Sequence, residues 1–191
     1  MLEEAYRLAA DLGDERELAH AKRYLGEALT WYGDVERGAR LLDEALAWHR
    51  TAPRWTVQAL TTFYTCAQAN SLLGHTDRAV TLLEECQRIC ASLGERWALS
   101  WSEWHFGVVW WTAGALRKAS ARLREALRRK RELRDDTGAP FCLEPLGWVA
   151  AAEGDPRRAA SSTTTRPSAK RWERKRRPVP SPPTCPGGGR C

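Results

Sequence analysis

The sequence lacks the features that mark membrane and secreted proteins. It has no run of roughly 18 or more apolar residues, the length that a membrane-spanning helix needs. Its opening segment, MLEEAYRLAADLGDE, is acidic and amphipathic, with neither the basic start nor the apolar centre of a secretory signal. We therefore expect a cytoplasmic protein that does not associate with a membrane.

Motifs that carry catalysis or bind nucleotides are also missing. There is no GxxxxGK[ST] phosphate loop, so no nucleotide site is expected. The four histidines have no cysteine, serine or acidic partner at the fixed spacing of a catalytic motif. We expect His75, in the turn after Gly74, and His49, near a helix end, to be solvated or to face a helix dipole. Asp135–Asp136 and Glu84–Glu85 are interpreted as solvated acids. The sequence predicts a protein that is not an enzyme and uses no cofactor.

The six cysteines do not form a metal-binding pattern. No CxxC pair exists, and Cys86 and Cys90, four residues apart on one expected helix face, have no further zinc ligands close in the sequence. Reduced thiols are the default in the cytoplasm. We expect Cys66, Cys86 and Cys142 to act as small buried apolar residues, and we expect no bound metal.

The net charge of +6 is unevenly distributed along the chain. Residues 157–191 contain ten Lys or Arg and one acid, Glu173, whereas the preceding 156 residues contain 20 basic and 23 acidic residues. A nucleic-acid surface needs clustered positive charge. Such a surface is therefore not expected on residues 1–160.

A repeat with a period of about 40 residues is the dominant pattern. Turn glycines recur at intervals of 41, 40 and 40 residues, and small residues recur seven before and five after each of them. The turn glycines are Gly33, Gly74, Gly114 and Gly154; the small residues before them are Gly26, Ala67, Gly107 and Gly147, and those after them are Gly38, Ala79, Ala119 and Ala159.

This pattern predicts an all-α solenoid of antiparallel helix pairs, because a lone helix pair cannot bury its apolar stripe and must stack on its neighbours. No alternating strand pattern competes with this prediction. The repeat domain is expected to span residues 1–160, as half a repeat followed by about 3.5 repeats. Helices are predicted near residues 2–11, 15–32, 35–50, 55–73, 76–92, 96–113, 116–133 and 140–153.

Several residues predict where these helices begin. Asp34, Thr76 and Asp155 are helix-start signals, and Pro140 suits a first helical turn. Pro145 should kink the last helix or shorten its start.

The spacing resembles the tetratricopeptide repeat over residues 1 to about 160, with a period longer than the usual one of about 34. The phrases LLDEALAWHR, GDVERGARLL and LREALRRKRELRDDTGAPFCLEPLGWVAAAEGDPRRAA also resemble the C-terminal repeat region of bacterial signal-transduction ATPases with a LuxR-type DNA-binding domain. That resemblance implies a sensor and autoinhibitory region. Because the phosphate loop and the DNA-binding motif are missing and the chain starts in mid-repeat, we interpret it as a fragment of a larger regulator or a decayed gene.

Residues 161–191 differ abruptly in composition from the repeats. They are rich in Arg, Pro, Ser, Thr and Gly and contain no leucine, although the fourth repeat requires an apolar helix there. We expect a disordered basic tail, since it lacks apolar side chains to offset an ordering entropy of roughly 1–2 kcal/mol per residue. It is either an authentic tail able to touch nucleic acid or an acidic partner, or an out-of-frame translation, which the abrupt change favours. The uncovered repeat edge predicts self-association.

The first helix of each repeat is expected to line a concave face through positions 2, 5, 9 and 12, counted with the small residue before the turn glycine as position 8. These positions predict an aromatic groove for a protein or peptide partner, the regulator's own ATPase module, or a small effector. The candidate site residues are Arg23, Tyr64, Gln68, Trp101, Trp104, Trp111 and Trp148.

The competing interpretation is that these tryptophans only complete the packing between repeats, as aromatic residues at helical spacing often do. Trp110 is assigned to the core, and ALRRKREL to an outer, solvated face. The predicted function is therefore a protein-interaction and sensor scaffold from a truncated bacterial regulator. The alternatives are a free-standing repeat scaffold and weak nucleic-acid binding by the tail.

Overall fold

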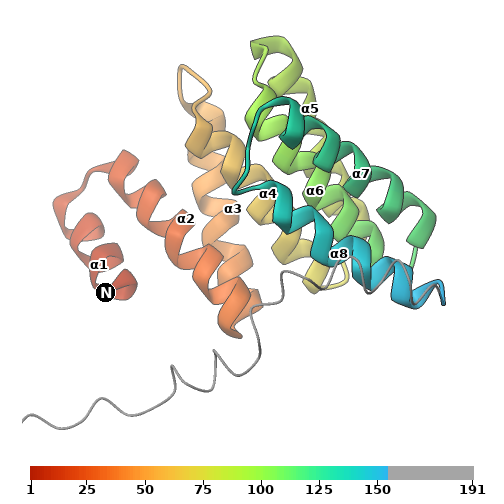
Figure 1. Cartoon of the computed structure of the whole chain (residues 1–191). Helices are drawn as coiled ribbons and strands as arrows, with labels where there is room; N and C mark the ends of the chain where they lie inside the picture. The colour runs from red at the N-terminus through yellow and green to blue at the C-terminus, as the bar shows by residue number, and fades with distance from the viewer. Residues whose placement is uncertain (155–191) are drawn as a thin grey trace, which may run out of the picture.

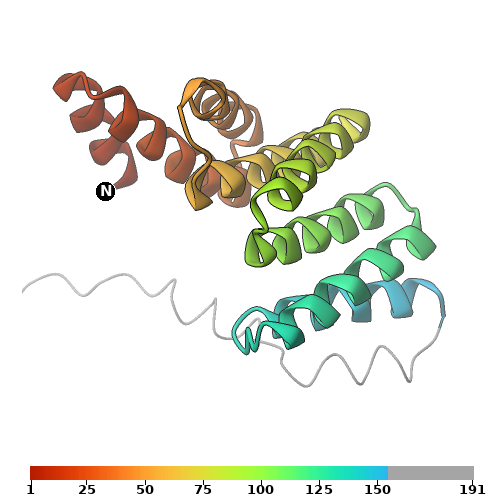
Figure 2. The same cartoon turned by 90° about the horizontal axis from the view of Figure 1, so that it is seen from above.

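The computed structural model describes residues 1–154, which form a curved stack of eight α-helices without a strand (Figures 1 and 2). Every predicted helix is present, with bounds within two residues of those expected from the sequence. The helices are α1 (Leu2–Leu12), α2 (Glu15–Tyr32), α3 (Val35–Thr51), α4 (Val57–Leu72), α5 (Thr76–Leu93), α6 (Arg96–Thr112), α7 (Leu116–Glu132) and α8 (Ala139–Ala152).

Consecutive helices form the predicted pairs, α2 with α3, α4 with α5, and α6 with α7. We call the first helix of each pair an A helix and the second a B helix; α1 is then a B helix and α8 an A helix. The A helices also contact one another along the stack, α2 with α4, α4 with α6, and α6 with α8. Figure 2 shows that the pairs follow a curved path. The fold is a tetratricopeptide-like helical solenoid.

The small residues lie where the two helices of a pair cross, as the sequence predicts. A Cβ atom on Gly26 would lie 2.9 Å from the carbonyl oxygen of Gly38, and one on Gly107 would lie 2.4 Å from Cγ of Leu123. Each turn glycine has a positive φ, between 74° and 123°, a conformation in which only glycine avoids steric cost. A turn glycine therefore ends each A helix, and separate small residues, glycine in α2, α3 and α6, permit the close crossings.

Two clusters of buried side chains form the core. The first extends from α3 to α6 and includes Leu42, Phe63 and Leu83, and the second lies between α6, α7 and α8. Trp101 and Trp110 pack against both, so the two clusters are continuous. Trp110 therefore packs on the core, as predicted.

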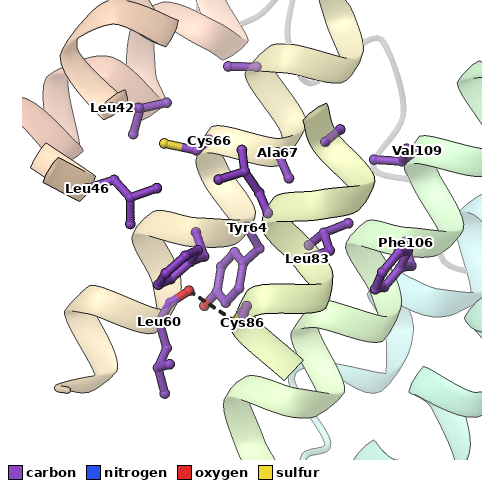
Figure 3. Close-up of a cluster of buried hydrophobic side chains, with 14 of the residues drawn as sticks. Leu42, Leu46, Leu60, Tyr64, Cys66, Ala67, Leu83, Cys86, Phe106 and Val109 are labelled. Atoms are coloured by element: carbon purple, nitrogen blue, oxygen red, sulfur yellow. Dashed lines mark hydrogen bonds between the residues drawn. The ribbon is translucent and has the colours of Figure 1, made fainter. Parts of the chain in front are cut away.

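The cysteines also confirm their predicted role. Cys66, Cys86 and Cys142 are fully buried free thiols. The thiol of Cys86 donates to the carbonyl oxygen of Leu60 at 3.7 Å, and Figure 3 shows this bond inside the first cluster. Burial raises the pKa of the Cys142 thiol to about 11, so this group is protonated at neutral pH.

Helix starts follow the sequence at some positions and not at others. Asp34 caps α3, accepting a hydrogen bond from the Arg37 backbone N–H at 3.1 Å. Thr76 is the first residue of α5, so this helix starts where the sequence predicts, although no side chain caps it. Pro140 lies in the first turn of α8 as predicted, and Pro145 lies inside the helix without shortening its start.

Three sequence predictions concern residues outside the described range of 1–154. They are the helix start at Asp155, the repeat edge beyond residue 160, and the basic tail of residues 161–191. Within the described residues, no helix combines the length and apolar character needed to cross a membrane.

Candidate functional site

A pocket of about 340 Å³ opens between the four A helices. Every A helix contributes to its wall, so the predicted concave face exists. The lining residues are Glu27, Thr30 and Trp31 from α2; Tyr64, Thr65 and Gln68 from α4; Trp97, Trp101, Trp104 and His105 from α6; and Phe141 from α8. Six of these eleven side chains are aromatic, and Glu27 is the single residue among them that is charged at neutral pH.

The aromatic wall comes mainly from α6. Trp97, Trp101 and Trp104 are spaced four and three residues apart, which places them on one helix face. Trp101 makes edge contacts with Trp104 and Phe141, with ring centroids 5.9 and 5.4 Å apart. Edge-to-face packing of this kind is favourable beyond the burial of area, so the wall is assembled before any ligand arrives.

Pro145 explains how Trp104 is held in this wall. Proline has no backbone N–H, so the carbonyl oxygen of Phe141, four residues earlier in α8, loses its helical donor. The indole Nε1–H of Trp104 donates to that oxygen at 2.6 Å. The proline therefore does not break α8, because a side chain of the neighbouring A helix satisfies the carbonyl that it leaves free.

His105 presents a neutral ring to the pocket. Its Nδ1 lies 2.9 Å from the carbonyl oxygen of Trp101, and since a carbonyl only accepts, Nδ1 carries the proton. Burial lowers the pKa of His105 to about 4, against a smaller opposing effect of this hydrogen bond. The ring stacks on Tyr64 with centroids 4.5 Å apart. At neutral pH its Nε2 is therefore an acceptor.

Two further polar groups in the wall are available for hydrogen bonding. Gln68 is 3% exposed, and its Oε1 has no hydrogen-bond partner within the described chain. Glu27 is held by Arg23, whose Nη1 lies 2.9 Å from Glu27 Oε2. The guanidinium of Arg23 also lies 3.8 Å from the centre of the Tyr24 ring, which fixes its position.

A buried lysine lies behind the aromatic wall, and the sequence did not predict it. Lys130 is fully buried, with its Nζ 3.4 Å from the centre of the Trp101 ring and 3.4 Å from Asp135 Oδ2. Burial lowers the pKa of Lys130, against the opposing charge of Asp135. The assignment of ALRRKREL to a wholly solvated face is therefore wrong at this residue.

His49 also departs from its predicted environment. It is 2% exposed, its ring centroid lies 6.1 Å from that of His20, and its Nε2 has no hydrogen-bond partner among residues 1–154. Burial, followed by the nearby His20 and Arg23, lowers the pKa of His49 to about 4. The expectation of a solvated histidine is wrong here because α3 turns this position inward against α2.

The structure brings together four of the seven candidate site residues. Tyr64, Gln68, Trp101 and Trp104 line the pocket. Arg23 lies outside the lining and orients Glu27. Trp111 and Trp148 pack on each other with ring centroids 5.0 Å apart, away from the lining residues.

Four lining residues were not among the predicted groove positions. Each lies next to a predicted groove position on the surface of its helix. The pocket is therefore lined by a wider stripe of each helix than positions 2, 5, 9 and 12 alone. These residues are Trp31, Thr65, Trp97 and His105. The arrangement offers aromatic surface, hydrogen-bond acceptors and one donor, the buried indole N–H of Trp101, which has no partner among residues 1–154. No group of three or more potential metal ligands occurs among residues 1–154.

Comparison with solved structures identifies similar folds. A Rap protein complexed with Competence and Sporulation Factor matches with a TM-score of 0.71 and 16% identity over 78% of this chain and 42% of that one. The apo form of RapI matches with a TM-score of 0.64 and 18% identity over 83% and 45%. A putative kinesin light chain of P. anserina with nearly identical TPR-like repeats matches with a TM-score of 0.60 and 17% identity over 84% and 79%.

The present chain thus spans less than half the length of either Rap protein. At these identities the likeness is one of fold. No protein-family model matches the sequence, and no curated protein is significantly similar to it.

Proposed function

We propose that this chain is a binding scaffold that holds a peptide or an exposed segment of a partner protein in the pocket between its A helices. The observation that carries the proposal is the pocket itself, which combines six aromatic side chains with a buried, unpaired Gln68 Oε1. Aromatic side chains supply much of the binding energy at protein interfaces. Leaving a buried acceptor unpaired costs about 1–3 kcal/mol, which a ligand that donates a hydrogen bond would recover.

The similar folds support this proposal. One of the Rap proteins was solved in complex with Competence and Sporulation Factor, so a protein of similar fold binds another molecule. The pocket volume of about 340 Å³ falls within the range of roughly 300–1,000 Å³ in which ligand pockets commonly lie. Binding without catalysis is part of the proposal, and the cytoplasm is the proposed location, since free buried thiols suit a reducing compartment.

We further propose that the scaffold is the sensor region of a bacterial transcriptional regulator and that the ATPase module of that regulator is a partner. The phrases that resemble such regulators support this origin. Flanking DNA that encodes a phosphate loop and a DNA-binding domain is the expected finding. Flanking genes without either would favour a free-standing scaffold.

Selection of a random phage-displayed peptide library on the purified chain tests the binding function. Selected peptides should bind a variant with both Trp31→Ala and Trp97→Ala at least about tenfold more weakly, because both side chains line the pocket while remaining partly exposed. A matched control replaces Leu12 and Leu93, which are exposed and lie outside the lining. Selected peptides that bind the tryptophan variant with full affinity would contradict the proposal.

A further inference from the structure

We infer that the anchor group of the ligand is a guanidinium, supplied by an arginine side chain of the bound peptide. This inference rests on the proposed binding function and specifies the chemistry of the same pocket. The inference rests on three features of the lining. It has acceptors on three helices, six aromatic side chains around them, and no lysine or arginine.

The acceptors come from three different A helices. Glu27 of α2 contributes a carboxylate, whose Oε2 accepts from Arg23 Nη1 at 2.9 Å while the side chain remains 37% exposed. Gln68 of α4 contributes its unpaired Oε1, and rotation about the last bond of an amide side chain is broad, so this oxygen can turn to a ligand. His105 of α6 contributes Nε2, since its Nδ1–H donates to Trp101.

A ligand that satisfies acceptors on three helices must donate several hydrogen bonds. A guanidinium carries five N–H donors in one plane and no acceptor. An apolar side chain would leave Gln68 Oε1 unpaired, and a quaternary ammonium has no N–H to offer. The number of acceptors in the lining therefore favours a ligand with several donors.

The aromatic walls favour a guanidinium over a lysine ammonium. A guanidinium is weakly hydrated and stacks on aromatic faces, whereas an ammonium is a strongly hydrated point charge. Six aromatic side chains replace little of the water that an ammonium would lose on entering. The same walls accept the flat faces of a guanidinium while its edges reach the acceptors.

The charges around the pocket are consistent with a cationic ligand. Glu27 is the one residue with a formal charge at neutral pH in the lining. Lys130 is fully buried behind Trp101 and lies close to Asp135, so its ammonium does not open onto the pocket. Arg23 lies outside the lining and holds Glu27 in place, and the buried Glu103 is paired with Arg122 at 3.0 Å.

Three synthetic peptides test the inference on the full chain. Their sequence is acetyl-Ala-Ala-X-Ala-Ala-amide, where X is arginine, its uncharged isostere citrulline, or leucine. Affinity is measured by titration, and the site is identified by NMR from the indole N–H signals of Trp101 and Trp104. The arginine peptide should move these signals and bind at least about tenfold more tightly than either of the others.

Two variants complete the experiment. Glu27→Gln should weaken the arginine peptide about tenfold, without changing binding of the citrulline peptide. The control Glu44→Gln changes an exposed acid outside the pocket, paired with Lys22, and should change neither. Equal affinity for the three peptides, tightest binding of the leucine peptide, or no binding of any at millimolar concentration would overturn the arginine assignment. The proposed binding function would still stand if library-selected peptides depend on Trp31 and Trp97, so the two failures are distinguishable.

Discussion

At the scale of single residues, one position of the repeat is buried although titratable side chains stand there. His49, Cys90 and Lys130 each lie sixteen residues after a turn glycine, and all three are at most 2% exposed. The last turns of α3, α5 and α7 therefore each bury a titratable group against the rest of the stack. Burial disfavours the charged forms of His49 and Lys130 and lowers the pKa of both, so these two positions make stability depend on pH.

His49 provides a test of this pH dependence. Its folded pKa of about 4 lies below the unfolded value of about 6.5, so the unfolded state binds more protons between these values. The stability due to neutral His49 is fully present above pH 6.5 and is lost as pH falls toward 4. At pH 5 the loss relative to pH 7.5 is about 2 kcal/mol for this residue.

Urea denaturation of the wild type and of His49→Leu at pH 7.5 and pH 5 measures this effect. The variant should lose about 2 kcal/mol less stability than the wild type over that interval. His75→Gln, which replaces an exposed histidine, serves as the control and should track the wild type. Equal pH dependence of the wild type and His49→Leu would show that His49 is protonated in the folded state without cost.

The buried lysine shows why the sequence predicted the fold better than the environment of each charge. Lys130 lies in the run RRKR, which is typical of a solvated helix face. It nevertheless continues the buried stripe of α7 formed by Ala119, Leu123 and Ala126 at spacings of four, three and four. The stripe indicates burial, but it does not show the partners that make burial of the ammonium tolerable. These are the aromatic face of Trp101 and the hydroxyl of Ser100, both on α6, and the carboxylate of Asp135.

At the scale of single helices, α8 depends on α6 for its regularity. Pro145, inside this helix, has no N–H to donate to the carbonyl oxygen of Phe141, and the indole N–H of Trp104 donates to that oxygen instead. The two residues should therefore be energetically coupled, since the hydrogen bond of Trp104 matters only while residue 145 lacks an N–H. A double-mutant cycle measures coupling of this kind.

Trp104→Phe removes the indole donor and should destabilise the chain by about 0.5–1.5 kcal/mol, because the partly buried carbonyl of Phe141 loses its partner. In the Pro145→Ala background the same substitution should cost roughly 1 kcal/mol less, since the alanine N–H can bond to Phe141. The cycle is measured by urea denaturation. Trp148→Phe is the control, because Trp148 makes no bond to that carbonyl, and additive effects of Trp104 and Pro145 would refute the coupling.

The helices were easier to predict than the pocket for a physical reason. Turn glycines and small residues at crossings have local requirements, a positive φ and a missing Cβ, which a single sequence displays directly. The pocket instead depends on how four helices are rotated against one another. Trp111 and Trp148 lie at predicted groove positions but pack on each other. His105, one residue after Trp104, lies outside those positions and lines the pocket.

At the scale of the whole molecule, burial is unequal along the stack. Ala9 is the one buried residue of α1, whereas α4 and α6 are buried through most of their length. Helices with few buried apolar contacts open at low free energy, and core helices open only when the whole domain unfolds. The central A helices should therefore form the most stable unit of the solenoid.

Hydrogen exchange followed by mass spectrometry tests this gradient. Amides of α1 should open with a free energy of about 0–2 kcal/mol, while those of α4 should approach the global free energy of unfolding. The ion pair between Arg37 of α3 and Glu3 of α1 is largely exposed and should add little, so Arg37→Met should leave α1 exchange nearly unchanged. Protection of α1 equal to that of α4 would show that the stack unfolds as one unit.

The pocket draws its walls from helices that begin at Glu15 and end at Ala152, and this has a mechanical consequence. A ligand bound there would contact both the first complete repeat and the last A helix. Its binding energy should then oppose any straightening of the superhelix. A force that separates α2 from α8 should expel the ligand, so the bound chain should be stiffer than the free chain and should release its ligand when stretched.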